Sequence, residues 1–250
     1  MIEDSLVHAL ATATPNSLDP FDFSNHDLPK TLDDAYRVQL ALLSARREQV
    51  AGWKVGGQGT EGNPICAAIG NHHLFDVEAA AAQHFYPGAG LELELYFTLG
   101  REFKAEDIHL SDEEILNSIA SFGMAIEWVQ SRFKGWPNVN KLLQLSDVQN
   151  NGALLVGPSY PYDPSYDLMS PHPNFTLEGK SILKGAGMNP AGDPRDLLPW
   201  VVRHCCHYQI KLHSNTIITT GSYSGIHFPE SGGHLQASFS GLPLIELQLL

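Results

Sequence analysis

Two glutamates, Glu92 and Glu94, stand two residues apart in a segment (residues 91–100) where apolar and other residues alternate. This alternation, the aromatic residues near the end and the terminal glycine predict a β-strand. Residues two apart on a strand point to the same face, so both carboxylates project together while the leucines project the other way. Neighbouring carboxylates repel and raise each other's pKa unless a positive charge lies between them. A hard divalent cation, which prefers oxygen ligands, would relieve that repulsion.

A third glutamate, Glu127, interrupts an apolar run at residues 123–130 that predicts a buried strand. A lone acid between Ile126 and Trp128 is costly to bury unless it is paired or bound to a cation. The first two glutamates alone are also compatible with a half-exposed strand whose outer face is acidic, because exposed glutamates need no special cause. All three together favour a site for Mg²⁺ or Mn²⁺ in which other coordination positions stay open to water and substrate.

Two further positions could take part in chemistry. Lys54 lies between Trp53 and Val55 in a predicted strand at residues 50–57. It is either an edge lysine whose amine reaches water, which its neighbours alone favour, or a partly desolvated lysine with a lowered pKa, suited to proton transfer. Ser222 belongs to a loop of glycines and hydroxyl residues that could hold a carboxylate or an enolate oxygen through main-chain N–H groups. A plain turn is equally compatible with that loop.

The histidine pair does not form a convincing metal motif. His72 and His73 are adjacent, so their side chains diverge in regular structure, and no third ligand follows at a useful spacing. We expect both to be loop residues. Asp76, which follows Leu74 and Phe75, is a candidate buried acid because of its apolar neighbours.

Helices and further strands must position these residues. A short helix and then a loop are expected before residue 28, and Thr31 predicts an N-cap for a helix that extends to about residue 49. Ser111 predicts the start of a helix to about residue 121, and Asp193 with Pro194 predicts one to about residue 212. The remaining strands are expected at these positions: 152–157, 174–179, 216–221, and an antiparallel pair at 235–239 and 242–249.

Composition limits the possible functions. The chain has 250 residues, of which 43% are hydrophobic, and a formal net charge of −13. The negative charge argues against binding to nucleic acid or to an anionic membrane without a local basic patch. Three cysteines, two of them adjacent, make a poor disulfide framework and suggest reduced thiols. There is no apolar run of membrane-spanning length and no signal-peptide pattern, so we expect a soluble, cytoplasmic protein.

Several segments, in this order, resemble the 2-keto-4-pentenoate hydratase family, which includes 2-oxohepta-3-ene-1,7-dioate hydratases, within the fumarylacetoacetate hydrolase superfamily. The ordered set spans most of the chain from about residue 31 onward. The matching segments are residues 52–56, 92–100, 125–127 with Ser131 and Arg132, 147–157, 189–190 and 219–225.

The resemblance implies a mixed α/β fold, a β-roll or sandwich with peripheral helices, and assembly into homo-oligomers. We expect a helical segment at residues 1–50 and one catalytic domain at residues 51–250. The implied cofactor is Mg²⁺ or Mn²⁺ held by the three glutamates, with an acid–base role for Lys54. Asp147 and Asp76 match acidic positions near the family's site. Ser222 and Gln149 are expected to contact the substrate.

The implied reaction is the addition of water to a small 2-hydroxy-2,4-dienoate or related 2-oxo acid, of the kind formed in aromatic-ring breakdown, which gives a 4-hydroxy-2-oxo acid. The chain departs from the family before the first metal glutamate, where Ala89, Gly90 and Leu91 replace the usual proline and arginine, and in residues 57–90. Three alternatives therefore stay open. They are a 2-oxo-dienedioate decarboxylase, a carbon–carbon hydrolase in which His72 or His73 pairs with Glu78, and an inactive binding or assembly subunit.

Overall fold

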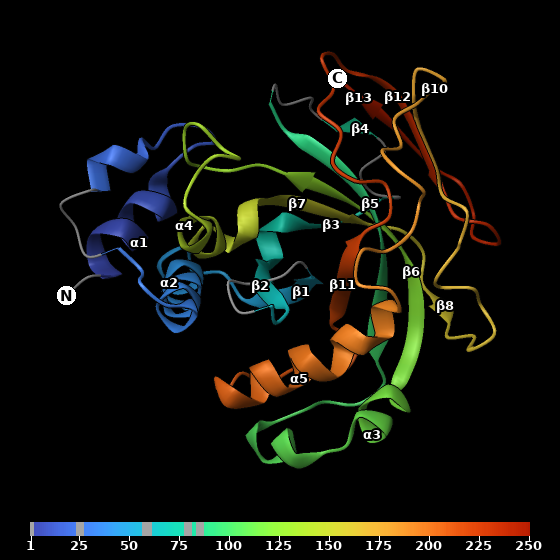
Figure 1. The fold of residues 1–250 in the computed structure, drawn as a ribbon, viewed down its shortest axis with the longest axis horizontal. Helices are drawn as coiled ribbons and strands as arrows, with labels where there is room; N and C mark the ends of the chain where they lie inside the picture. The colour runs from blue at the N-terminus through green and yellow to red at the C-terminus, as the bar shows by residue number, and fades with distance from the viewer. Residues whose placement is uncertain (1–2, 24–27, 57–61, 78–81, 84–87) are drawn as a thin grey trace.

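The structure is a computed structural model that describes residues 3–23, 28–56, 62–77, 82–83 and 88–250. Two β-sheets form its centre, and helices lie around the larger one (Figure 1). The mixed α/β class with peripheral helices is therefore confirmed. In the described residues the α-helices are α1 (Glu3–Thr12), α2 (Leu32–Ala45), α3 (Asp112–Leu116), α4 (Lys141–Ser146) and α5 (Leu197–His207).

The larger sheet has the strand order β2-β1-β11-β5-β6-β7-β3, with β8 paired to β6. Its long central pair, β5 and β6, is antiparallel, whereas β1 and β11 are parallel. Its strands are β1 (Val50–Gly56), β2 (Ile65–Gly70), β3 (Leu74–Asp76), β5 (Gly90–Leu99), β6 (Ile119–Val129), β7 (Asn151–Val156), β8 (Tyr160–Pro161) and β11 (Ile217–Ser222).

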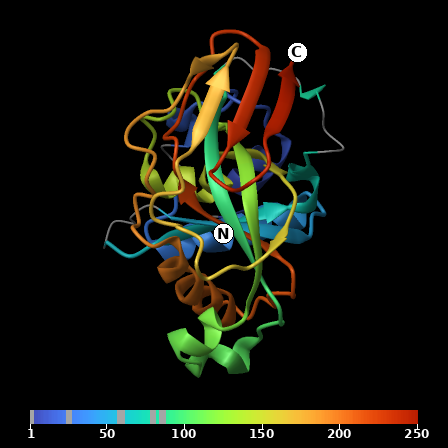
Figure 2. The same ribbon diagram turned by 90° about the vertical axis from the view of Figure 1, so that its right-hand side faces the viewer.

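The smaller sheet has the order β10-β9-β12-β13-β4 and includes the predicted antiparallel pair near the C-terminus. Figure 2 shows β9, β12 and β13 side by side, with the long strands β5 and β6 beyond them. The inner side chains of both sheets share one apolar core. Its strands are β4 (Ala82–Gln83), β9 (Asn174–Leu177), β10 (Lys180–Ser181), β12 (Gly233–Ser238) and β13 (Ile245–Leu249).

Three predicted helices are shorter than expected, including α2, which ends at Ala45, before the left-handed Arg47 (φ 57°), and not at residue 49. The Ser111 capping box is present, but α3 ends at Leu116 because the chain enters β6 at Ile119. Helix α5 ends at His207 because Gln209 takes a left-handed conformation (φ 56°), which stops a right-handed helix. The Thr31 capping box of α2 is present as predicted.

The N-terminal helices pack on the larger sheet through a second apolar cluster that joins α1, α2 and α4. Gln39 of α2 also covers the edge strand β2: its amide lies 3.4 Å from both the Cys66 carbonyl and the Ala68 N–H, and donates to the Leu145 carbonyl at 2.6 Å. A covered edge cannot pair with another chain. The division into segments 1–50 and 51–250 stays a prediction.

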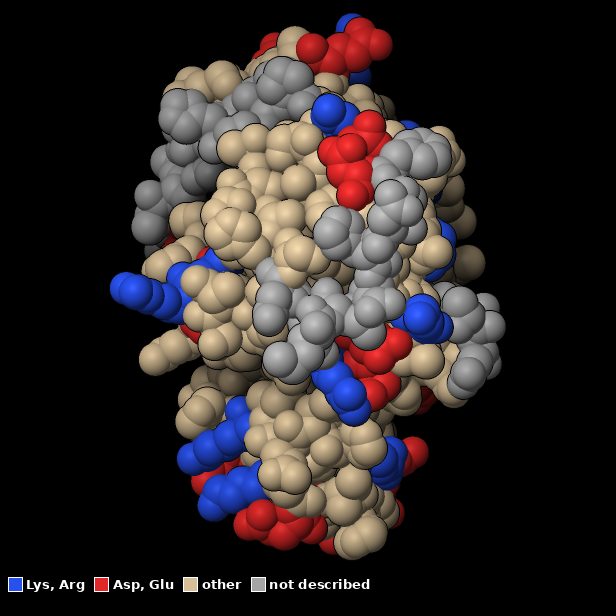
Figure 3. Space-filling model, turned by 90° about the vertical axis from the view of Figure 1, so that its left-hand side faces the viewer, with Lys and Arg blue, Asp and Glu red and all other residues tan. Residues whose placement is uncertain are grey.

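All three cysteines are buried and free. No helix in the described part of the chain is long and apolar enough to cross a membrane. On the face shown in Figure 3, basic side chains lie among acidic ones and around uncharged surface.

Candidate active site

Three carboxylates meet on one face of the central strand pair. Glu92 of β5 lies directly opposite Glu127 of β6 in the antiparallel register, and Glu94 is the next residue on the same face of β5. Each offers an oxygen, and these ligand atoms lie within 4.8 Å of one another. The neighbouring leucines of β5 are buried in the core on the other side, as predicted.

Curling of the sheet brings Lys54 onto this cluster. Strands β1 and β6 are three steps apart in the sheet order, which on a flat sheet is roughly 14 Å, farther than a lysine side chain reaches. In the folded chain, however, Lys54 Nζ forms an ion pair with Glu127 Oε1 and donates to the Gln149 carbonyl at 3.2 Å.

Both interpretations of Lys54 from its sequence context were wrong in part. Its amine does not reach bulk water, because the residue is only 8% exposed. Its pKa is raised rather than lowered: burial alone would lower it, but the charges of Glu127, Glu94 and Glu92 outweigh burial. Lys54 is therefore a protonated lysine that faces three acids, a partnership that its immediate sequence neighbours do not reveal.

The paired glutamates carry strongly shifted pKa values. Burial, followed by the charge of Glu127, raises the pKa of Glu92 to about 7 and that of Glu94 to about 8. The charge of Lys54 acts in the opposite direction on both. One Lys54 cation thus compensates only part of the negative charge of three acids, and protons on Glu92 and Glu94 compensate much of the rest.

The chemistry of this donor set fits a divalent cation. Glu94 Oε2 and Glu127 Oε2 are buried and have no hydrogen-bond partner, an arrangement that leaves desolvated oxygens without compensation. Carboxylate oxygens are the ligands that hard divalent cations prefer. In the described part of the chain this is the only group of three or more His, Cys, Asp or Glu residues with ligand atoms so placed.

Two residues that follow α4, Gln149 and Asn151, form hydrogen bonds with the Lys54–Glu127 pair. Asn151 Nδ2 donates to Glu127 Oε1 at 3.1 Å, and the Gln149 carbonyl accepts from Lys54. The predicted contact residue Gln149 therefore reaches the site through its main chain. Its side-chain oxygen is buried without a partner, and the residue lines the space beside the three carboxylates.

Ser222, the other predicted contact residue, lies beside the glutamates. A bulge in β11 between Thr219 and Ser222, which contains Gly221 in a left-handed conformation (φ 96°), brings Ser222 opposite Glu94. Its hydroxyl also acts on Glu92, where it opposes the rise in pKa caused by burial. The hydroxyl-rich loop thus reaches the face of the sheet that carries the three carboxylates.

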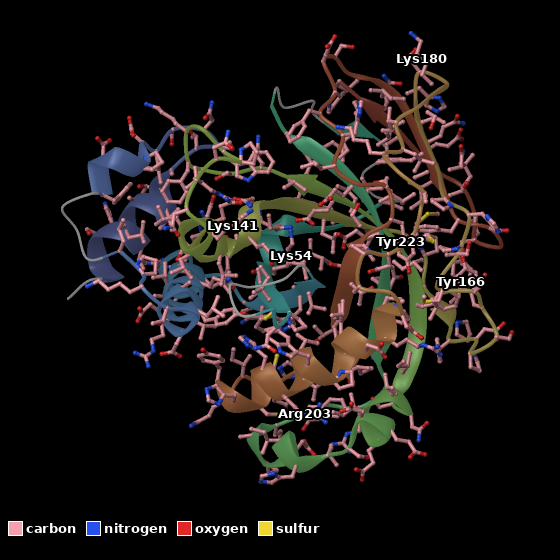
Figure 4. The ribbon with its side chains drawn as sticks, viewed as in Figure 1. Lys54, Lys141, Tyr166, Lys180, Arg203 and Tyr223 are labelled. Atoms are coloured by element: carbon pink, nitrogen blue, oxygen red, sulfur yellow. The ribbon has the colours of Figure 1, made fainter. Side chains whose placement is uncertain are left out.

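An apolar cavity of about 390 Å³ opens beside the cluster. Lys54, Glu92 and Gln149 form its polar end, and Lys141 at the start of α4 supplies a second lysine (Figure 4). This volume suits a small organic molecule. The apolar lining residues are Leu32, Ile65, Val129, Trp136, Pro137, Leu142, Leu145 and Ile226.

The two predicted aspartates lie outside this cavity. Asp147 is fully buried and forms an ion pair with Arg132, and it lines neither the cavity nor the space between the glutamates. Asp76 is exposed at the end of β3. It pairs with Val156 of β7, which pairs with Ala125 of β6, which in turn pairs with Glu94 of β5, so three strand spacings separate Asp76 from Glu94. The expectation that Asp76 is buried was wrong, and the catalytic roles of both acids stay predictions.

The histidines also lie away from the cavity. His72 is exposed, while His73 lies 2.8 Å from the Gly152 carbonyl and 3.5 Å from Glu48. Glu78, the partner considered for a hydrolytic pair, lies outside the described residues. Among the acids that the structure describes, Glu48 lies beside His73.

Sequence reasoning missed Asn151, the main chain of Gln149, and the cavity residues Trp136 and Lys141. The polar run at residues 149–151 directly before a buried strand is the one signal that could have indicated them, since polar residues at such a position often serve a site. Lys141 carries no local signal that separates it from any other surface lysine.

No family model matches the sequence, and no curated protein matches it. Solved structures do match. A 4-oxalocrotonate decarboxylase from Pseudomonas putida G7, complexed with calcium and acetate, has a TM-score of 0.76 at 16% identity, covering 98% of this chain and 96% of that one. The same decarboxylase complexed with magnesium and adipate also gives 0.76 at 16% identity, covering 100% and 96%. Fumarylpyruvate hydrolase from Pseudomonas aeruginosa, with Mn²⁺ and pyruvate, gives 0.51 at 14%, covering 79% and 88%.

These likenesses establish the architecture alone, because identities of 14–16% are too low to assign roles to individual residues. The similarity to the decarboxylase includes the N-terminal helices, whereas the similarity to the hydrolase covers a smaller share of the chain. The chain therefore has the fold of the fumarylacetoacetate hydrolase superfamily, seen over its whole length in a 4-oxalocrotonate decarboxylase.

Proposed function

We propose that this protein is a divalent-metal-dependent hydro-lyase that adds water to a small 2-hydroxy-2,4-dienoate or 2-oxo-enoate. The observation that carries the proposal is the contact between Lys54 and the three-glutamate cluster at the polar end of an apolar cavity. The cluster supplies ligands for a metal, the lysine holds a proton, and the cavity accepts a short carbon chain. Hydration of an unsaturated 2-oxo acid would use all three features.

Glu92, Glu94 and Glu127 would hold Mg²⁺ or Mn²⁺. Two buried carboxylate oxygens without partners support this assignment, as do the magnesium and manganese in the structures of similar fold. When bound, such an ion would supply Lewis acidity toward the carboxylate and 2-oxygen of the substrate.

Lys54 would act as the acid–base group. Its raised pKa keeps a proton on Nζ, and its hydrogen bond to the Gln149 carbonyl fixes the amine at the polar end of the cavity. From there it can deliver a proton to the conjugated chain during ketonisation, which prepares the double bond for water addition. The Ser222 hydroxyl is placed to orient the substrate's polar end, and the apolar walls of the cavity would contact the remaining carbon chain.

The second lysine points to a substrate with a second carboxylate. Helix α4 rises about 1.5 Å per residue, so Lys141 at its start stands roughly 9 Å along the helix axis from its C-cap Asp147, two residues before Gln149. Lys141 has no ion pair with a described acid, and it lines the same cavity as Lys54. A dioate would place one carboxylate near the glutamates and the other near Lys141. Because Lys141 is exposed, solvent screening keeps its contribution modest.

Decarboxylation of a 2-oxo-dienedioate is the second candidate, and the likeness to a decarboxylase over the whole chain favours it. Lys141 argues in the other direction. A cation beside a carboxylate that departs as carbon dioxide stabilises the substrate more than the transition state, which slows that step. Hydration retains the distal carboxylate, so the lysine would aid binding without opposing the reaction.

Mass spectrometry of the products separates these reactions. Metal-free protein is reloaded with Mg²⁺ or Mn²⁺ and given 2-hydroxydienoates with and without a distal carboxylate. We expect a product heavier by one water, whereas loss of carbon dioxide would identify a decarboxylase, and release of a second acid would identify a hydrolase. Lys141→Met should raise KM for the dioate alone, with Lys180→Met, on exposed β10, as the matched control.

Calorimetric titration with Mg²⁺ and Mn²⁺, with and without oxalate, tests the site independently of substrate. If neither metal binds, the enzyme proposal fails and the binding or assembly subunit becomes the leading interpretation. Homo-oligomer formation and a cytoplasmic location stay predictions.

A further inference from the structure

Three consecutive residues behind the site have a left-handed backbone although none is glycine. Val148, Gln149 and Asn150 have φ values of 44°, 52° and 59°. Such conformations are unfavourable for side-chain-bearing residues, most of all for a β-branched one such as Val148. They persist where the surrounding structure fixes them, and they concentrate at functional sites.

The buried ion pair between Asp147 and Arg132 contacts this left-handed turn at both ends. Before the turn, Asp147 Oδ2 accepts from the Arg132 main-chain N–H at 2.8 Å and from Ser131 Oγ at 2.9 Å. Arg132 Nη1 lies 3.2 Å from Asp147 Oδ1 and donates to the Asn151 carbonyl at 2.7 Å, after the turn. One guanidinium therefore brackets the segment, and both charged partners are almost completely buried.

The turn and the residue after it form one hydrogen bond to each member of the Lys54–Glu127 pair. The Gln149 carbonyl accepts from Lys54 Nζ at 3.2 Å, and the Asn151 side chain donates to Glu127 at 3.1 Å. A right-handed backbone at Gln149 would direct that carbonyl elsewhere. The handedness of the turn therefore decides whether Lys54 has its second acceptor.

We propose that Asp147 and Arg132 are positioning residues, which hold the left-handed turn so that the Gln149 carbonyl fixes Lys54 against Glu127. Neither residue lines the substrate cavity, so they act through the turn and not on the substrate. This assignment rests on the proposed acid–base role of Lys54, and it gives Asp147 a role other than the catalytic one expected from the sequence.

Chemical labelling of lysines tests the positioning without metal or turnover. Metal-free protein is treated with an amine-specific reagent, and modification of Lys54 is followed by mass spectrometry against exposed Lys180 as internal standard. In Asp147→Asn and Arg132→Lys, Lys54 should react about tenfold faster, the factor expected when a charged donor loses one hydrogen bond. Leu247→Ala, a core truncation in β13 of the other sheet, should leave the labelling ratio unchanged. An unchanged ratio in all variants would overturn the proposal.

A double-mutant cycle on turnover supplies the second test. Asp147→Asn should lower kcat about tenfold or more with little change in KM, and should have almost no further effect in a Lys54→Met background, because both changes disable the same group. Fully additive losses would show that Asp147 acts independently of Lys54. If no substrate is turned over, the proposed function fails, yet the labelling result still decides the positioning role.

Discussion

Stability of the metal-free protein should fall as pH rises through neutrality, because folding raises the pKa of two of its glutamates and keeps them largely protonated. The folded-state pKa values of Glu92 and Glu94 are about 7 and about 8, against an ordinary value of 4.5. The folded state thus holds protons that the unfolded state has released. A group whose pKa is raised by folding contributes stability below the shifted pKa and loses it as pH rises through that value.

The size of this effect follows from the two shifts. Between about pH 6.5 and 8.5, linkage gives a loss of about 2 kcal/mol from Glu94 and just under 1 kcal/mol from Glu92, so the free energy of unfolding should fall by roughly 2–3 kcal/mol. Three histidines with lowered pKa values, His73, His204 and His227, act mainly below the ordinary histidine pKa of 6.5 and offset part of this loss at the acidic end of the window, whereas the thiols with raised pKa values act at more alkaline pH. This window is therefore dominated by the two glutamates.

Urea unfolding of the EDTA-treated protein across that window measures the loss. Glu94→Gln should remove most of the slope, whereas Glu246→Gln, an exposed glutamate on β13, should leave it unchanged. Saturating Mg²⁺ should abolish the decline, since the cation takes the place of the protons. A flat or rising free energy of unfolding in metal-free wild-type protein would refute this account of Glu92 and Glu94.

Three other changes have defined outcomes. Glu127→Gln should abolish activity and calorimetrically detectable Mn²⁺ binding while circular dichroism shows the fold intact; full activity would remove the basis for the metal site. Lys54→Met should lower kcat by about 10²–10⁴-fold, the range for loss of an acid–base group, while Mn²⁺ still binds; an unchanged kcat would exclude a role in proton transfer. Gln39→Leu should lower the free energy of unfolding by about 1–3 kcal/mol in urea titrations, because the Leu145 carbonyl and Ala68 N–H lose their partner; Gln236→Leu on half-exposed β12 serves as its control.

Local patterns predicted the carboxylates well because their placement is a property of single strands. The two-residue spacing of Glu92 and Glu94 fixes their common face, and the apolar neighbours of Glu127 indicate that it is buried. The antiparallel pairing that brings these strands together was not readable, although the charges suggested it. Helix starts were predicted by their capping residues, whereas helix ends depended on the next strand or on a left-handed residue.

The partner of Lys54 could not be predicted, because it depends on how strongly the whole sheet curls. Nothing near residue 54 reports the position of Glu127, 73 positions later. The same holds for Asp147. The sequence suggested a catalytic role for this acid, whereas in the structure it forms an ion pair with Arg132 and accepts a hydrogen bond from the Arg132 main chain. Distant contacts of this kind are absent from periodicity and spacing.

The curled sheet also sets the order in which the site can form. Its groups come from β1, β5, β6 and the turn before β7, so no contiguous fragment contains them all. A metal ion cannot nucleate folding from so dispersed a set, because long loops must close before its ligands meet. The chain must instead bring three acids together first, with Lys54 and bound protons as temporary counter-charges. The Lys54 charge thereby allows the protein to fold before a metal ion binds.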